Sequence, residues 1–185
     1  TSSELESLSA RLTSLEATEQ NLILVSTGQR VEVYGASTVD TLKARGTGGN
    51  DNYRITKLDG LVNNIDFKDL GDGNDFVDVN LDGNIDLVES SRLDILIEGG
   101  LGHDTITINA GAAGHTVNNI VLAGNDGDDR MRVSSSVIAS VTMIGGMGGD
   151  TLRIDGEDNK YQNFVAFGGE GNDTIFGGVN EDFIF

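Results

Sequence analysis

The sequence of 185 residues contains no cysteine and no proline, and aromatic residues make up only 5% of it. The absence of cysteine excludes disulfide bonds, thiolate metal ligands and cysteine catalysis. A hydrophobic share of 37%, with so few aromatics, predicts a thin core rather than a deep, wide one. No apolar run approaches the roughly 18 residues of a transmembrane helix, so we expect no direct membrane insertion.

Basic residues are scarce as well: 12 Lys and Arg stand against 30 Asp and Glu, and the net charge is -18. Binding to nucleic acid needs basic patches, so this balance excludes it as an ordinary function. Anionic membranes are disfavoured for the same reason. Water and cations are the partners that suit such a chain, and the spacing of the acidic residues has to decide between them.

The first 21 residues differ in texture from the rest. Ser3 and Glu6 match the S-x-x-E capping box of a helix N-terminus. We therefore predict an α-helix over residues 1–21, which either packs on the following domain or forms an oligomerising coiled coil. Leucines in this segment recur at the a and d spacings of one helix face, namely Leu5, Leu8, Leu12 and Leu15.

From residue 22 to residue 185, short apolar alternations are separated by Gly, Asn and Asp, which is typical of strands and turns. The first strands are predicted at Leu22–Val25 and Val31–Tyr34. A nine-residue pattern, G-G-x-G-x-D-x-U-x with U a large apolar residue, then recurs, for example as GGEGNDTIF from Gly168. Its seven copies begin at Gly46, Leu70, Gly99, Gly124, Gly145, Gly168 and Gly177.

This pattern resembles the calcium-binding nonapeptide of RTX (repeats-in-toxin, hemolysin-type) proteins. The resemblance implies an all-β fold, a parallel β-solenoid (β-helix or β-roll) stabilised by several calcium ions that lie between consecutive turns. The alternative at any single copy is a Gly-Asp turn without metal. By the resemblance, the Asp of each copy is a calcium ligand: Asp51, Asp75, Asp104, Asp129, Asp150, Asp173 and Asp182.

The spacing of these Asp residues predicts the shape of the coil. Successive copies lie 24, 29, 25, 21, 23 and finally 9 residues apart. Two residues after each Asp the chain carries an apolar residue, and a second one follows in most copies two positions later, which indicates strands that stack like on like. We therefore expect a solenoid with one calcium-binding edge and about two dozen residues per coil.

A second motif, DVNLDGNIDLVE over residues 78–89, satisfies the EF-hand loop formula D-x-[DN]-x-[DN]-G-x5-E. It resembles the calcium loop of EF-hand and dockerin proteins, although the flanking Phe76 and Val77 favour strand over helix. We expect an EF-like loop inserted between coils, and an acidic turn is the alternative. By the resemblance its ligands are Asp78, Asn80, Asp82, Asn84 through its carbonyl, Asp86 and Glu89.

No catalytic pattern accompanies these motifs, because His103 and His115 lie outside H-E-x-x-H and no G-x-S-x-G or Walker loop occurs. We expect a non-enzymatic, extracellular or cell-surface structural or adhesive module that folds and assembles on binding calcium. A non-catalytic calcium module of a secreted enzyme and a trimeric phage-type fibre segment are the alternatives. The apolar Phe183–Phe185 predicts self-association or a larger parent chain, and a cell-surface polysaccharide is a further candidate partner.

Overall fold

The computed structural model describes residues 21–185 except 27, 36–38, 61, 69, 82–84, 88–92, 111–116, 135–137, 156–160 and 179–181. The described residues form an all-β protein with sixteen strands and no helix. They accordingly contain no helix that is long and apolar enough to cross a membrane. The helix predicted for residues 1–21 lies outside the described residues, apart from Asn21, with which the first strand begins.

The strands form two parallel sheets, and successive strands along the chain mostly alternate between them. Sheet A contains, in spatial order, β1 (Asn21–Val25), β3 (Thr41–Arg45), β5 (Asn64–Phe67), β8 (Leu93–Leu101), β10 (Val117–Asp126), β12 (Ile138–Met147), β14 (Tyr161–Glu170) and β16 (Asp182–Ile184). Sheet B contains β2 (Val31–Tyr34), β4 (Asn52–Gly60), β6 (Phe76–Asn80), β9 (Thr105–Asn109), β11 (Arg130–Ser134), β13 (Thr151–Asp155) and β15 (Thr174–Phe176), with the short β7 (Ile85–Leu87) beside the end of β4.

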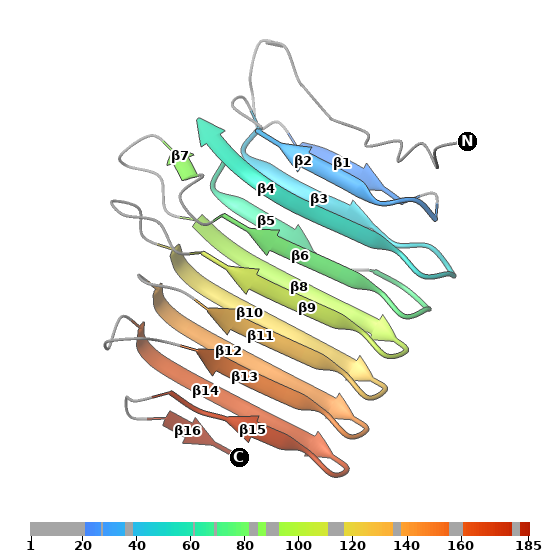
Figure 1. The fold of residues 1–185 in the computed structure, drawn as a ribbon, viewed down its shortest axis with the longest axis vertical. Coiled ribbons are helices and arrows are strands. Elements are labelled where there is room, and N and C mark those ends of the chain that lie inside the picture. Colours follow the sequence, from blue (N-terminus) through green and yellow to red (C-terminus); the bar gives the residue numbers. More distant parts are fainter. Residues whose placement is uncertain are drawn as a thin grey trace, which may run out of the picture.

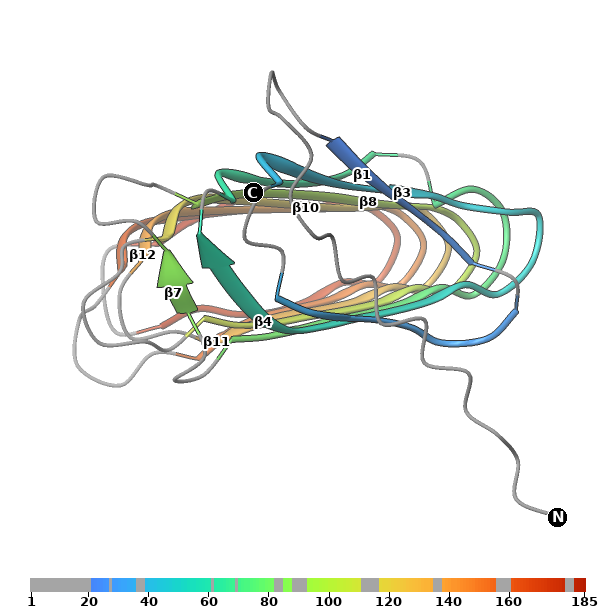
Figure 2. The ribbon, with the colours of Figure 1, turned by 90° about the horizontal axis from the view of Figure 1, so that it is seen from above.

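Each coil consists of one strand of sheet A, a tight turn, one strand of sheet B and a loop that returns to sheet A. The coils stack into a flattened tube, as seen from the side in Figure 1 and along its axis in Figure 2. Every strand pair is parallel. Neighbouring coils are joined by these hydrogen-bonded strands and are therefore about 4.8 Å apart. This architecture confirms the predicted parallel β-solenoid and the strands predicted at Leu22–Val25 and Val31–Tyr34.

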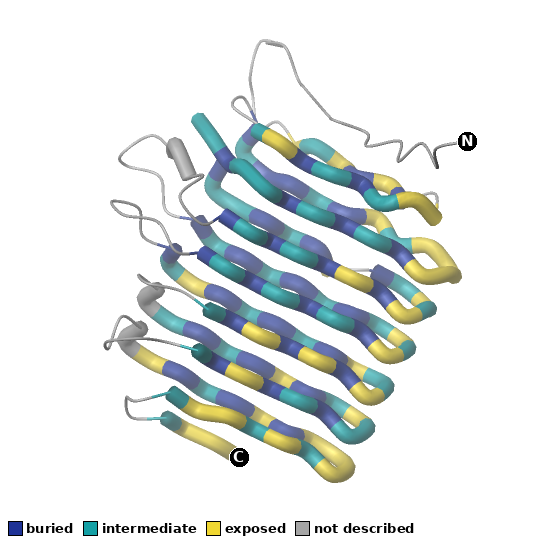
Figure 3. Tube along the Cα trace, in the orientation of Figure 1, coloured by how far each residue is buried: buried dark blue, intermediate teal, exposed yellow. Residues whose placement is uncertain are grey.

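The core is the thin layer between the two sheets. Alternate residues of each strand point inward, which gives the regular stripes of buried residues in Figure 3. The predicted apolar column that begins two residues after each Asp is buried at Tyr53, Val77, Ile106, Met131 and Leu152. From sheet A, the facing column is Ile65, Ile95, Ile120, Val141 and Phe164, each at most 1% exposed.

The last nonapeptide copy departs from the expected stack. Only nine residues separate Asp173 from Asp182, and this length carries the chain from β15 in sheet B across to β16 in sheet A. Asp182 is consequently in register with Phe164, and Ile184 with Ala166. Ile184 is half exposed, whereas its counterparts in the other copies lie in or against the core.

Candidate metal site

The tight turns that join sheet A to sheet B stack directly on one another along the right-hand edge of Figure 1. Each turn is the G-G-x-G-x-D part of one nonapeptide, and we call the stack the Asp corner. A glycine, or a residue in its place, opens each turn, and the Asp closes it just before the strand of sheet B. The six turns of the Asp corner are 46–51, 70–75, 99–104, 124–129, 145–150 and 168–173.

The closing Asp residues form a continuous hydrogen-bonded ladder. The backbone N–H of each Asp donates to Oδ1 of the Asp in the next turn, at 2.8–3.0 Å between N and O. The side chains therefore point along the stack into the turns and not out into water. The ladder joins Asp51, Asp75, Asp104, Asp129, Asp150 and Asp173.

A second ladder runs in the opposite direction through the residue that precedes each Asp. Its backbone N–H donates to the side chain at the same position in the turn before, so Asn74 donates to Asn50 and His103 to Asn74. Asp128 donates to Nδ1 of His103, and Gly149 to Oδ1 of Asp128, both at 2.8 Å. Together the two ladders pair backbone N–H groups at a corner where the sheets themselves end.

The glycines of the turns are explained by close stacking. Gly73, Gly102, Gly127, Gly148 and Gly171 occupy the fourth turn position with φ between 123° and 133°, a region that L side chains rarely adopt. A Cβ at any of them would collide with backbone atoms of the turn before. At the first position, a Cβ would collide instead with the carboxylate of the closing Asp, and this holds at Gly99, Gly124, Gly145 and Gly168.

The Asp corner leaves buried carboxylate oxygens without partners. Asp75, Asp104, Asp129 and Asp150 are at most 2% exposed. Within the described part of the chain, Oδ2 of each of these four residues has no hydrogen-bond partner. The first turn differs, because Oδ2 of Asp51 accepts a 2.7 Å bond from the backbone N–H of Thr47. The backbone N–H of Thr47 therefore supplies a hydrogen bond that the residue at the second position of the other turns, Gly or Asn125, does not.

Burial of these carboxylates shifts their protonation. Desolvation raises the pKa of Asp75 from 3.8 to about 7, against the lowering effect of the hydrogen bond from the backbone of Asp51. Desolvation likewise raises the pKa of Asp129 to about 6. The pKa values of Asp104 and Asp150 are raised for the same reason. The neighbouring charged carboxylates along the row add to the shift at Asp75 and Asp129.

The carboxylates are spread along the stack and do not form a compact cluster. Among the described residues, no group of three or more His, Cys, Asp or Glu side chains lies close enough together to hold a metal ion. Any cation here would therefore need backbone carbonyls as additional ligands. Asp182 does not belong to this row, although its carboxylate blocks an added Cβ at Gly177, as the carboxylates of Asp104, Asp129, Asp150 and Asp173 do at their own first glycines.

The EF-like motif begins inside sheet B. Asp78 and Asn80 lie in strand β6, and the Asp78 carboxylate is 3.3 Å from Nε of Arg54 on the adjacent strand β4. Asp86 lies in β7, which pairs with the end of β4. Asp82, Asn84 and Glu89 lie outside the described residues. The described part thus places two of the predicted ligands on an extended strand, with one of them in an ion pair.

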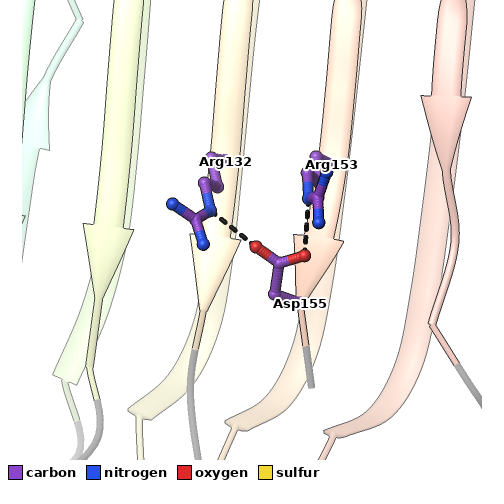
Figure 4. A network of polar contacts seen from close by, with 3 residues as sticks. All are labelled: Arg132, Arg153 and Asp155. Atoms are coloured by element: carbon purple, nitrogen blue, oxygen red, sulfur yellow. Dashed lines mark hydrogen bonds and ion pairs between the residues drawn. The ribbon is translucent and has the colours of Figure 1, made fainter. Parts of the chain in front are cut away.

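Two polar features were not predicted from the sequence. One is the ladder through Asn50, Asn74, His103 and Asp128. The sequence pattern that could have revealed it is that the position before the Asp mostly carries a side chain that can accept a hydrogen bond. The other lies on the outer face of sheet B, where Asp155 binds Nε of Arg132 at 2.5 Å and Nε of Arg153 at 2.6 Å (Figure 4). The two arginines face each other in register on β11 and β13, which alternation along those strands could have suggested.

Comparison with known proteins adds no relative: no protein-family model matches the chain, and neither a curated protein nor a solved structure gives a significant match. The fold itself defines the class of the molecule, which is a parallel β-solenoid with a hydrogen-bonded Asp corner.

Proposed function

We propose that the chain is a calcium-stabilised β-solenoid that acts outside the cell as a structural or adhesive module, without catalytic activity. The observation that carries this proposal is the row of buried carboxylates in the Asp corner. In Asp75, Asp104, Asp129 and Asp150, one oxygen is bonded to a backbone N–H and the second has no partner in the described structure.

A row of buried carboxylates is unfavourable when the carboxylates are ionised and no counter-ion is bound. Successive carboxylates of the ladder are one coil apart, about 4.8 Å, and a buried charge without a partner costs several kcal/mol. The cost is removed either by protonation or by a cation. A divalent ion acts on several neighbouring carboxylates at once, which suits a chain with a net charge of -18.

The donor atoms fit calcium, which prefers six to eight hard oxygen ligands. The closing Asp residues supply carboxylate oxygens. The carbonyl oxygens of Gly73, Gly102, Gly127 and Gly148 face the next turn, since each approaches the glycine stacked on it. Calcium bound at this corner would neutralise the carboxylates and join consecutive turns, and the chain itself supplies the turn shape and the ladders that hold the oxygens in place.

The variant Asp104→Asn distinguishes a carboxylate that is neutralised by a proton from one that is neutralised by a bound cation. It keeps the Oδ1 atom that accepts the bond from Asp75 and deletes the negative charge. In chelator, we expect it to melt at a higher temperature than the wild type at pH 8, because a buried charge is gone. In calcium we expect the order to reverse, because a ligand charge is gone. Saturation of one site at 100 times Kd stabilises the wild type by about 2.7 kcal/mol.

A matched control is Asp94→Asn, which changes an acidic residue on the outer face of sheet A, away from the Asp corner. It should shift the calcium-induced change in melting temperature little. Calorimetry or circular dichroism of the wild type and both variants, in calcium and in chelator, decides the matter. The proposal fails if calcium leaves the melting temperature of the wild type unchanged, or if Asp94→Asn abolishes the calcium effect as fully as Asp104→Asn.

Exposed apolar side chains at the β16 end support the assembly part of the proposal. Phe183, Ile184 and Phe185 are all at least half exposed, and Phe185 stacks on Phe167 of β14 with ring centroids 5.0 Å apart. An apolar strand at a sheet edge is a template for further pairing, either with another copy of the chain or with a longer parent chain. Light scattering should show self-association of the wild type in calcium that Phe183→Asp and Ile184→Asp together remove; a strictly monomeric wild type at high concentration would refute it.

A further inference from the structure

The outer face of sheet A carries a groove of about 490 Å³ that the Asp corner does not involve. It extends across the first half of the sheet, from β1 through β3, β5 and β8 to β10. In this region the strands of sheet A are less closely aligned than further along the stack, and β1 crosses the others obliquely in Figure 2. Because the groove runs across the strands, each successive strand contributes the register partner of the residue on the strand before.

A row of polar side chains lies along the groove, one from each strand. Neighbours in the row are partners in the parallel register, so they follow one another at about 4.8 Å. Amides, a hydroxyl and a carboxylate therefore repeat with the period of the solenoid. The row consists of Asn21, Thr41, Asn64, Asp94 and Asn119.

The hydrogen bonds within this row leave capacity for a ligand. Nδ2 of Asn64 donates to Oγ1 of Thr41 at 3.4 Å. Nδ2 of Asn119 and of the adjacent Asn118 both donate to Oδ1 of Asp94, at 3.4 and 3.0 Å. These bonds use amide nitrogens, the hydroxyl of Thr41, which also donates to Asp40, and one carboxylate oxygen. Among the described residues, the amide oxygens of Asn64 and Asn119, Oδ2 of Asp94 and the second hydrogen of each amide have no partner, so they remain to bind hydroxyl groups.

The groove is electrically balanced in a strongly acidic chain. Lys43 and Lys68 face Asp66 and Asp94 among its lining residues, so two positive and two negative charges cancel. Lys68 lies 3.7 Å from Asp66, and Lys43 is the register partner of Asp66. An anionic polymer would meet no net attraction here. The lining therefore favours a neutral ligand that offers both donors and acceptors.

An apolar strip borders the polar row. Leu96 of β8 and Val121 of β10 are register partners, both are only half-buried, and both line the groove. A row of hydrogen-bonding groups beside an apolar strip matches a sugar ring, whose edge carries hydroxyl groups and whose faces carry C–H groups. The repetition at each coil matches a polymer in which the same unit recurs.

We propose that this groove binds an uncharged polysaccharide chain that lies across the strands of sheet A. Asn64, Asp94 and Asn119 contact its hydroxyl groups, and Leu96 and Val121 contact the face of a ring. The proposal rests on the proposed adhesive function and gives it a class of ligand. It does not require that calcium occupy the Asp corner.

Affinity electrophoresis tests the proposal, with the full chain run in calcium through native gels that contain one soluble polysaccharide each. The neutral probes are β-glucan, galactomannan, arabinoxylan and dextran, and the acidic probe is polygalacturonate. We expect retardation in at least one neutral gel and none in polygalacturonate. The double variant Asn64→Ala, Asn119→Ala should weaken that retardation at least about tenfold in association constant, which corresponds to about 1.4 kcal/mol.

The matched control is Asn163→Ala, since Asn163 continues the same column beyond the groove on β14 and is exposed. It should bind like the wild type. Absence of retardation in every neutral gel, retardation in polygalacturonate alone, or unchanged binding by the double variant would overturn the proposal. Melting temperatures of all three proteins in calcium and chelator are measured in parallel. Retardation without a calcium shift would refute calcium stabilisation and leave the groove assignment standing.

Discussion

The backbone N–H of Asp75 donates a 2.8 Å hydrogen bond to Oδ1 of Asp104, a residue 29 positions later in the chain. The same bond recurs at each step of the Asp corner, although the loops between successive Asp residues differ in length. The N–H of an Asp within the row thereby binds the coil that follows, and its Oδ1 accepts the bond from the coil before. In Asp75, Asp104, Asp129 and Asp150, one carboxylate oxygen accepts this bond, which leaves the other for a proton or a cation.

The stacking of glycine on backbone predicts a sharp contrast between two Gly→Ala variants. Gly102 has a φ of 129° and touches the carbonyl of Gly73, whereas Gly48 has no heavy atom within 4 Å of an added Cβ and an ordinary φ. We expect Gly102→Ala to lower the free energy of unfolding by about 3 kcal/mol through strain and collision. Gly48→Ala should change it by less than about 1 kcal/mol, in the stabilising direction. Urea denaturation measures both, and equal effects would contradict the account.

The second ladder is interrupted at Gly149, which has no side chain to accept the N–H of the next turn. An added Cβ at Gly149 would come no closer than 3.4 Å to Asn172 O, and its φ is not in the left-handed region. Gly149→Asn should therefore extend the ladder to Asn172 and raise the free energy of unfolding by about 1 kcal/mol. Gly149→Ala is the control for the loss of backbone freedom alone. A melting temperature for the Asn variant no higher than that of the Ala variant would argue against the added bond.

The raised pKa values predict how the metal-free protein responds to pH. The pKa of Asp75 is about 7 and that of Asp129 about 6 when folded, against 3.8 for an ordinary Asp. The folded state binds these protons more tightly, so their contribution to stability is complete below about pH 4 and is lost as pH rises through about 6 to 7. In chelator, the melting temperature should fall between about pH 5 and pH 8. The two arginines lower the pKa of Asp155, so the contribution of Asp155 to stability is lost only as the pH falls into a more acidic range.

Calcium should weaken this pH dependence, because an ion that replaces the protons stabilises the charged carboxylates at neutral pH. Thermal melts at matched ionic strength, with and without calcium, provide the comparison. Asp75→Asn, which retains Oδ1, should flatten the metal-free profile. A profile that rises from acid to neutral pH in chelator would show that the carboxylates are not the groups that decide stability.

The EF-like motif predicts one site that is independent of the Asp corner. Changing Asp82→Asn together with Glu89→Gln should remove about one calcium ion and leave the remaining ions bound. Native mass spectrometry counts the ions directly. The matched variant Arg54→Gln should leave the count unchanged or raise the affinity of the loop, since it releases Asp78 from its ion pair. Identical stoichiometry in the wild type and the double variant would refute the site.

Much of the fold could be predicted because each nonapeptide encodes its own turn and the start of its strand. The apolar positions after the Asp predicted the buried column at Tyr53, Val77 and Ile106, since alternation along a strand fixes which residues point inward. The last copy shows the limit of that reasoning. Its local pattern is the same, but the nine residues after Asp173 place Asp182 in sheet A, because the length of the connection decides which sheet a strand joins.

The turn chemistry of this protein can be deduced from the sequence alone: Gly, or Asn125 in one turn, where the chain adopts a positive φ, Asp at the end of the turn, and apolar residues at every second position of the strand. The partner of each Asp and the burial of its carboxylate, by contrast, depend on how the coils stack. The partner is 21–29 residues away in the chain and comes within 3.0 Å of it only when the coils stack. Burial and the raised pKa of Asp75 are properties of that stack, since a single turn in water would leave both carboxylate oxygens hydrated.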